Sequence, residues 1–294
     1  MRIAAAAYPI DDLGTWAAYR DKLGSWIAEA AQNGADLLVF PEYGAMELAS
    51  LSQASDRGTR EGSIRAVNEW IDEAYALHAD LATRYGVHIL SASAPVAGDA
   101  RPVNQLRLFA PSGGLAIQEK QIMTRYEREV WDVRPGKPLT VIETDLGRIG
   151  ILICYDAEFP LLARALVSAG AEILLAPSCT EALSGYHRVR IGAMARALEN
   201  QCVAVHAPTV GEAPWCEPVD RNTGAAAIYG PPDLGFPDTG VIAQGEMNRP
   251  GWVYADIEHG AIARVRAEGR VCNHADWPRQ PVAGDSIEIT DIRA

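Results

Sequence analysis

The chain has 294 residues, of which 48% are hydrophobic and 22% charged, a composition that fits a globular protein and excludes a disordered one. Its formal net charge of −12 argues against a nucleic-acid or anionic-membrane surface, because either partner requires a basic footprint. We therefore expect its partners to be small molecules rather than nucleic acids or membranes.

The sequence carries no sign of export or of membrane insertion. Residues 1–7 hold one charge before Tyr8-Pro9, and no apolar stretch approaches the roughly 18 residues of a membrane span. The five cysteines form no tight pairs, which favours a reducing compartment without disulfides. The six histidines lack zinc-ligand spacing. We expect a cytoplasmic protein without a metal centre.

Helices and strands alternate in the first half of the chain. Apolar residues at helical spacing predict helices over residues 16–30 and 64–81, and β-favouring runs predict strands over 35–40 and 87–93. Two hairpins follow, with strands at 103–109 and 115–118 and at 139–143 leading into the run 148–153. Glu42 comes directly after the strand 35–40 and Pro41.

The second half repeats this alternation. A helix is predicted from Pro160, a strand at 171–176, a helix at 188–200 and a strand at 202–206. From residue 215 onward Gly and Pro are more frequent, and only short strands at 225–229 and 252–257 are expected before an irregular tail.

Two segments resemble each other within the chain. Residues 2–8 are similar to 148–155, and residues 33–42 are similar to 169–178, so each half reads strand, helix, Gly-Ala-acid, strand, Pro. This repeat predicts two sheets related by a pseudo-twofold, packed face to face with helices outside. Glu42, Cys154 and Ser178 follow or end strands, where α/β sheets bind ligands, so we expect them at one rim.

Cys154 lies on the predicted turn between the apolar strand and the helix that Pro160 opens. A lone cysteine at a strand end is usually inert core. The polar residues Tyr155-Asp156 that follow, and the second copy of the architecture upstream, favour a nucleophile instead. Such a turn exposes its side chain and points the next backbone N–H at the attacked atom.

Four ordered motifs resemble the nitrilase superfamily of carbon–nitrogen hydrolases. They lie at residues 40–43, 119–131, 153–160 and 185–200. The resemblance implies an α/β fold with two mixed β-sheets packed face to face in an αββα sandwich. It also implies one hydrolase domain over residues 1–262, a C-terminal tail over 263–294 that contacts other subunits, and a homodimer or higher homo-oligomer.

The resemblance implies a Glu-Lys-Cys catalytic set made of Glu42, Lys120 and Cys154. A thiol near its usual pKa needs a base, and a carboxylate shielded from water can serve, which assigns Glu42. Lys120 supplies the cation for the developing oxyanion, and the Tyr155 N–H is the second donor. The expected reaction passes through a thioester on Cys154 and needs no cofactor.

The family pattern places a second glutamate after the lysine, and two residues compete for that position. Glu127 lies seven residues after Lys120, and Glu129 follows shortly. We prefer Glu127, because Glu-Arg shortly before Val130-Trp131 matches the pattern better. It is expected to orient Lys120 or the substrate nitrogen.

Further residues are candidates for the substrate pocket. Glu181 could pair with a cationic substrate group, and Arg125 could hold a substrate carboxylate. The complete set is Tyr43, Arg125, Trp131, Glu158, Cys179, Thr180, Glu181 and His187.

Two alternatives remain for the bond that is cleaved, an amide or a nitrile. Cys154-Tyr155-Asp156 resembles amidases and carbamoyl hydrolases, which favours a small amide as substrate. Thr124, Glu127-Arg128 and Trp131 resemble nitrilases, although Met123 departs from their proline. We choose amide hydrolysis, with nitrile hydrolysis as the alternative. A catalytically silent small-molecule-binding member of the fold is the alternative of another class, and full retention of the three catalytic residues argues against it.

Overall fold

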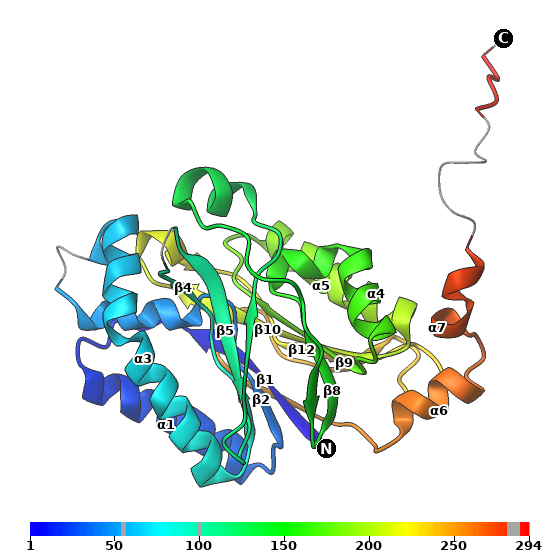
Figure 1. Cartoon of the computed structure of the whole chain (residues 1–294), viewed down its shortest axis with the longest axis horizontal. Coiled ribbons are helices and arrows are strands. Elements are labelled where there is room, and N and C mark those ends of the chain that lie inside the picture. Colours follow the sequence, from blue (N-terminus) through cyan, green and yellow to red (C-terminus); the bar gives the residue numbers. More distant parts are fainter. Residues whose placement is uncertain (54–56, 99–100, 281–288, 294) are drawn as a thin grey trace.

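The computed structural model describes residues 1–53, 57–98, 101–280 and 289–293. It is an αββα sandwich in which two halves of a curled β-sheet face each other and helices cover both outer faces (Figure 1). The halves join where β1 pairs with β10 at Tyr8–Thr209 and Pro9–Val210. The predicted fold class is therefore confirmed.

The first half of the sheet has the order β4-β5-β3-β2-β1, with β6 beside β5 and β14 beside β1. Its strands are β1 (Arg2–Pro9), β2 (Leu37–Val39), β3 (His88–Leu90), β4 (Ala94–Val96), β5 (Val103–Phe109), β6 (Leu115–Glu119) and β14 (Gly251–Asp256). The helical elements of this half are α1 (Trp16–Gln32), η1 (Gly44–Leu51), α3 (Arg60–Tyr85) and η2 (Glu127–Trp131).

The second half has the order β10-β9-β8-β7, with β11 and β12 beside β10 and β13 beside β12. Its strands are β7 (Ile142–Thr144), β8 (Gly147–Ile151), β9 (Ile173–Ser178), β10 (Val203–Glu212), β11 (Arg221–Asn222), β12 (Ala227–Tyr229) and β13 (Val241–Gln244). Its helical elements are η3 (Cys154–Glu158), α4 (Pro160–Ser168), α5 (Leu183–Asn200), η4 (Glu217–Val219), α6 (Ala261–Glu268), α7 (Asn273–Asp276) and η5 (Trp277–Arg279).

The predicted internal repeat is present as two equivalent successions of elements. In one half β1, β2 and β3 are parallel neighbours connected through α1 and α3, and in the other β8, β9 and β10 are parallel neighbours connected through α4 and α5. Parallel strands need such crossover helices. Both successions place the carboxyl ends of their strands, and the residues that follow them, toward one end of the sandwich (Figure 1).

Three clusters of buried apolar side chains lie between the four layers of the sandwich. Along β1, Ala4 and Ala6 pack with α1 and α3, while Ile3 and Ala5 face the other half of the sheet. Alternate residues of a strand point to opposite faces, so a strand buried on both sides must be apolar throughout. On β9, Leu174 belongs to the third layer, with α4 and α5.

The region after residue 260 is more regular than the irregular tail that the sequence predicts. Helix α6 buries Ile262 and Val265, one turn apart, and Arg266 donates from Nε to the carbonyl of Gln201 at 3.0 Å. The expected boundary between residues 262 and 263 thus falls inside α6. Tail residues 281–288 and 294 lie outside the described residues. No helix in the described part of the chain combines the length and apolarity needed to cross a membrane.

Candidate active site

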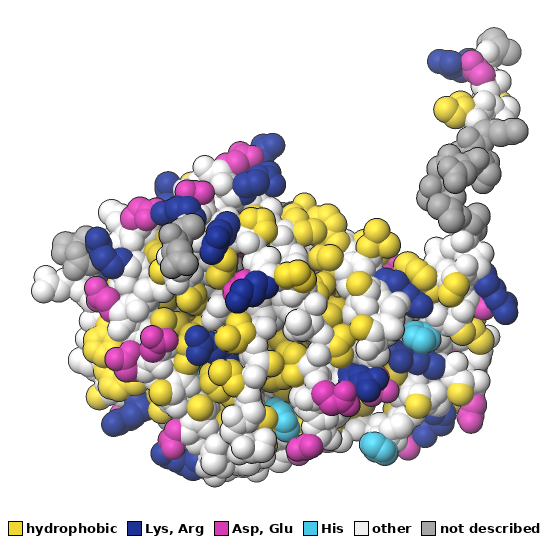
Figure 2. Space-filling view, in the orientation of Figure 1, with side chains coloured by type: hydrophobic (Ala, Val, Ile, Leu, Met, Phe, Trp, Pro, Cys, Tyr) yellow, Lys and Arg dark blue, Asp and Glu magenta, His cyan; other side chains and the backbone are white. Residues whose placement is uncertain are grey.

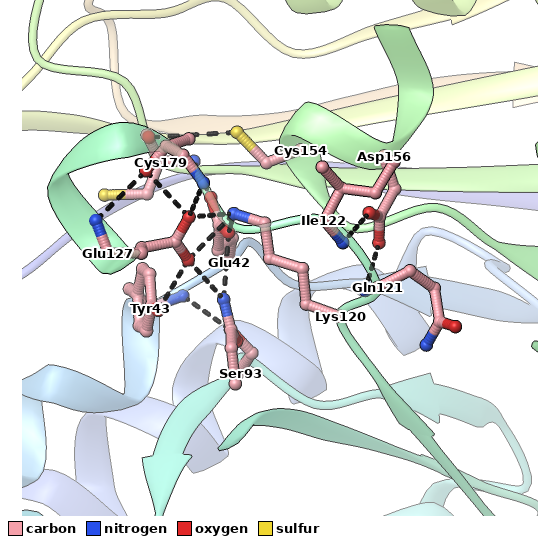
Figure 3. Close-up of polar contacts among 12 residues, drawn as sticks. Glu42, Tyr43, Ser93, Lys120, Gln121, Ile122, Glu127, Cys154, Asp156 and Cys179 are labelled. Atoms are coloured by element: carbon pink, nitrogen blue, oxygen red, sulfur yellow. Dashed lines mark hydrogen bonds and ion pairs between the residues drawn. The ribbon is translucent and has the colours of Figure 1, made fainter. Parts of the chain in front are cut away.

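Three segments far apart in sequence bring the expected catalytic set together. Glu42 follows β2 and Cys154 follows β8, both at the carboxyl ends of parallel strands, where α/β sheets bind ligands. Lys120 comes directly after β6, the strand paired with β5. Figure 3 shows the three side chains converging from these elements.

Lys120 joins two buried carboxylates. Its Nζ donates to Glu42 Oε1 at 2.7 Å and to Glu127 Oε1 and Oε2 at 2.8 and 2.7 Å (Figure 3). The side chains of Lys120 and Glu42 are each 1% exposed, and that of Glu127 is 4% exposed. A cation removed from water in this way requires opposite charges within contact distance.

Of the two acidic residues considered for the position after Lys120, Glu127 is the one that lies at the ammonium. Glu127 contacts the ammonium, whereas the Glu129 side chain is 51% exposed and pairs with Arg125 and Arg128 on the surface. The π-helical turn of η2 directs Glu127 inward. Thr124 fixes it further, since its backbone N and Oγ1 donate to Glu127 Oε2 at 2.9 and 2.8 Å.

Asn104 and Tyr43 are further donors to the two carboxylates. Asn104 Nδ2 donates to Glu42 Oε1 at 2.9 Å and to Glu127 Oε1 at 3.4 Å, and the Tyr43 hydroxyl donates to Glu127 Oε1 at 2.8 Å. Asn104 was not among the residues predicted from the sequence. Polar residues in the buried strand β5, Asn104 and Gln105 among them, were the available signal, because a buried polar group needs a partner.

Cys154 occupies a strained turn at the start of η3. Its φ of +51° lies in the left-handed region, which non-glycine residues adopt mainly where surrounding structure enforces it, often at functional sites. Gly192 on α5 allows this turn to sit close, because a Cβ there would lie 2.8 Å from the Ala157 carbonyl oxygen. Tyr155 is in the first turn of η3, where backbone N–H groups lack helical acceptors.

The Cys179 peptide connects the thiol to the expected base. The Cys154 thiol contacts the Cys179 carbonyl oxygen at 3.9 Å, and the Cys179 N–H donates to Glu42 Oε2 at 3.0 Å. Cys179 directly follows β9, so the second half of the sheet holds both contacts. Each of the two Glu42 oxygens therefore has at least one donor.

Burial and charge set the protonation behaviour of the cluster. Burial raises the pKa of Glu42 to about 7, against the opposing effect of Lys120. Burial also acts on Glu127, but its contacts with Lys120 hold its pKa below the usual value. Burial opposes the charge of Lys120, yet Glu127 and Glu42 raise its pKa well above normal. Burial and the Glu42 carboxylate raise the pKa of the Cys154 thiol.

The cluster opens into a pocket of about 680 Å³. Of the proposed pocket residues, those that line it are Tyr43, Arg125, Trp131, Glu158, Cys179, Thr180 and Glu181, together with the catalytic set and Tyr155. Arg125 and Glu181 are exposed at the rim, and Glu158 pairs with Arg188 at 3.4 Å. Arg188, Glu217 and Arg221 also line the cavity, although they were not among the predicted pocket residues.

His187, a candidate for the pocket in the sequence, does not line the cavity. It is exposed on α5 and is not among the described residues that line the cavity. Gly185, Arg188 and Val189 line it, and these positions share one face of a helix, whereas His187 is displaced around the axis. The described residues hold no group of three or more His, Cys, Asp or Glu side chains that could bind a metal ion.

Comparison with curated proteins gives several hydrolases. The chain is 31% identical over 271 residues to "Probable hydrolase YhcX" of Bacillus subtilis, covering 92% of this chain and 52% of that protein. It is 37% identical over 145 residues to deaminated glutathione amidase of Yersinia enterocolitica, covering 45% of this chain and 50% of that one. The chain thus spans about half the length of these two relatives.

Solved structures confirm the fold. A double mutant of the amidase from Nesterenkonia sp. AN1 in complex with acrylamide has a TM-score of 0.66 at 21% identity, covering 94% of this chain and 97% of that one. The C. elegans NitFhit protein has a TM-score of 0.74 at 20% identity, covering 90% of this chain and 62% of that one. The sequence matches the carbon-nitrogen hydrolase family over residues 2–267, and the chain therefore belongs to that family.

Proposed function

We propose that this carbon–nitrogen hydrolase cleaves the C–N bond of a small amide, giving a carboxylate and ammonia or an amine through a thioester on Cys154. The observation that carries the proposal is the convergence of Cys154, Glu42 and Lys120 at one pocket, with Lys120 2.7 Å from Glu42. A cavity of about 680 Å³ lies in the range of small-molecule sites.

In the proposed first half-reaction, the Glu42 carboxylate takes the thiol proton as Cys154 Sγ attacks the amide carbon. The new oxyanion is stabilised by the Lys120 ammonium and the Tyr155 N–H. When the C–N bond breaks, protonated Glu42 gives its proton to the departing nitrogen, so ammonia or an amine leaves. Glu127 keeps Lys120 charged and in place through the contacts described above.

In the second half-reaction, water replaces the amine. Glu42 accepts a proton from water, the resulting hydroxide attacks the thioester carbon, and the C–S bond breaks with return of a proton to sulfur. The net reaction consumes one water per amide bond. The steps use the named side chains, the Tyr155 N–H and one water.

Nitrile hydrolysis is the second candidate. It is supported by 27% identity over 281 residues to Nitrilase 3 of Arabidopsis thaliana, covering 88% of this chain and 79% of that one. Amide hydrolysis is favoured because the Yersinia relative, at 37% identity over 145 residues, is named an amidase. A nitrile would use the same nucleophile, with Lys120 facing the developing charge on nitrogen.

The deciding experiment measures ammonia release from matched amide, ureide and nitrile panels, with Cys154→Ala as the blank. Release from amides alone supports the proposal, and release from nitriles alone replaces it with the second candidate. A catalytically silent protein would release nothing from any panel. Including acidic, neutral and basic substrates tests whether Arg125 or Glu181 selects charge.

The pH dependence follows from the raised pKa of Glu42, which is about 7. The base is competent only when ionised, so kcat/KM on an uncharged amide should rise with pH, with half of its maximum near pH 7. The pKa values of Cys154 and Lys120 are shifted upward, so no decline is expected through about pH 9. A maximum below pH 6 in steady-state assays would contradict this assignment.

Homo-oligomer formation is part of the proposal. Apolar side chains gather over α4 and α5 in Figure 2, where Leu161, Leu183 and Ile191 are 73%, 52% and 61% exposed. Exposed apolar patches of this kind commonly mark protein contacts. Light scattering should give at least twice the chain mass for the wild type and a lower mass for Ile191→Glu. Leu115→Glu, at another exposed apolar site, is the control and should leave the mass unchanged.

A further inference from the structure

Asp156 is a buried carboxylate that the proposed mechanism does not use. It lies in η3, two residues after Cys154, and is fully buried. Its Oδ2 accepts the backbone N–H of Gln121 at 3.0 Å, and its Oδ1 accepts that of Ile122 at 2.8 Å (Figure 3). Both oxygens are thus engaged by main-chain donors, an arrangement that stabilises an ionised carboxylate.

These two hydrogen bonds connect the segment that follows Lys120 to the turn that carries Cys154. Gln121 and Ile122 directly follow Lys120, and the bonds span 35 and 34 residues of sequence. The main chain of Lys120 itself is held by other segments: its N–H donates to the Asn104 carbonyl of β5 at 2.9 Å, and its carbonyl accepts the Gly136 N–H at 2.8 Å. Asp156 therefore ties the segment that carries the ammonium to the turn that carries the thiol and the Tyr155 N–H.

We infer that Asp156 is a positioning residue, whose ionised carboxylate fixes Lys120 relative to Cys154 and whose protonation releases that connection. The expected effect of Asp156 on turnover rests on the proposed function. A carboxylate accepts both N–H groups with two charged oxygens, whereas an amide would place an NH₂ donor against one of them, and a protonated acid would offer one of them a weaker hydroxyl acceptor.

The surroundings of Asp156 make its protonation relevant near neutral pH. Burial raises its pKa to about 6, although the Gln121 and Ile122 N–H groups and Lys120 oppose the rise. The other charged groups nearby are Glu127 on the lysine segment and, on η3 itself, Glu158, which pairs with Arg188 of the adjacent α5.

Two buried acids must therefore both be ionised for full activity. As the pH falls, Glu42 takes a proton near 7 and Asp156 near 6. Below about pH 6, log kcat/KM of the wild type should fall with a limiting slope approaching two. A role for Asp156 in folding alone would leave a slope of one.

The test compares wild type with Asp156→Asn. We expect kcat to fall about 100-fold, the loss typical of a misplacement of about 1 Å, while KM changes less than about threefold. The limiting acid slope should drop from two to one. Asp156→Glu, which keeps an acceptor carboxylate, should recover part of kcat and the second protonation. Rates are expressed per active site, counted as iodoacetamide label on the peptide that contains Cys154 in a Cys272→Ser background, because Cys272 is exposed and Cys179 also lines the pocket.

Glu47→Gln is the matched control, because Glu47 is also fully buried and accepts a backbone N–H, that of Asp11 at 2.8 Å, but lies outside the pocket lining. It should lower the melting temperature without changing kcat per site or the acid slope. A wild-type slope of one, or an Asp156→Asn kcat per site equal to wild type, would overturn the inference.

The pH dependence of Cys154 alkylation separates this inference from the proposed function. Alkylation needs no amide substrate, and the turn that Asp156 holds also places the Cys154 thiol. The fall of the alkylation rate at low pH should therefore report the same two protonations in an enzyme of any specificity. If no panel substrate is turned over but the alkylation slope drops in Asp156→Asn, the positioning role stands and the amidase assignment fails. If the wild type and Asp156→Asn turn over panel amides equally well, the amidase assignment stands and the positioning role fails.

Discussion

Replacing Cys154 by alanine is expected to lower kcat/KM at least about 10⁴-fold, because the covalent intermediate can no longer form. The fold should survive, since the thiol is small and its contact in the described structure is a weak one to the Cys179 carbonyl at 3.9 Å. Ammonia release measures the loss of activity, and intact-protein mass spectrometry detects the covalent intermediate. The wild type, trapped during turnover, should carry the mass of the acyl group, and the variant should not.

Cys179→Ser is the informative control, because Cys179 is the other thiol that lines the pocket. Its contributions to the cluster are backbone groups: the N–H that reaches Glu42 and the carbonyl that faces Cys154. The serine variant retains both groups and should keep kcat within about tenfold of wild type. Acyl mass found on Cys179, or turnover that survives in Cys154→Ala, would reassign the nucleophile.

Local sequence patterns predicted the layers of the fold well, because each signal was periodic and strongly apolar. The strands predicted at residues 35–40 and 171–176 each contain a short apolar run after Gly-Ala-acid, and they are observed as β2 and β9 at equivalent places in the two halves. Turn-rich segments were less predictable. The strand expected at residues 139–143 is observed as β7 at Ile142–Thr144, and Val241–Gln244 forms β13, which was not anticipated.

The tail shows why short amphipathic elements escape sequence reasoning. Helix α6 has only eight residues and contributes three buried side chains, Ala261, Ile262 and Val265. A helix so short is unstable alone and depends on tertiary packing, here against the end of α5 through Gln201. The information that specifies it lies about 60 residues away, so no local window contains it.

The residues of the candidate site also divide into those that a local sequence pattern predicts and those whose role depends on tertiary contacts. Glu42 and Cys154 were predictable from strand ends, and Lys120 and Glu127 from the resemblance, because each occupies a recognisable motif. Asn104 was missed, since its role depends on β5 passing beside β6 and presenting an amide to two carboxylates at 2.9 and 3.4 Å. Tertiary contacts between motifs cannot be predicted from the spacing of the motifs in the sequence.

Lys120→Met is expected to remove both activity and much of the stability of the protein. The substitution leaves Glu42 and Glu127 buried without the ammonium that contacts them at 2.7 and 2.8 Å. Breaking a buried ion pair by removing one partner costs about 3–5 kcal/mol of unfolding free energy. Loss of the oxyanion cation should lower kcat/KM at least about 10³-fold. Urea unfolding and ammonia release measure the two losses.

The pH dependence of the Lys120→Met variant identifies the cause of its instability. Without the ammonium, both carboxylates should have folded-state pKa values above those of the unfolded chain. A carboxyl group shifted upward favours the folded state at low pH, and that contribution is lost as the pH rises through the folded-state pKa. The variant should therefore be most stable in mild acid. Adding Glu127→Gln removes one of the two charges and should restore part of the stability, but not the activity, because the cation is still missing. A variant with equal stability at pH 5 and pH 8 would show that the lysine does not hold these carboxylates in their ionised form.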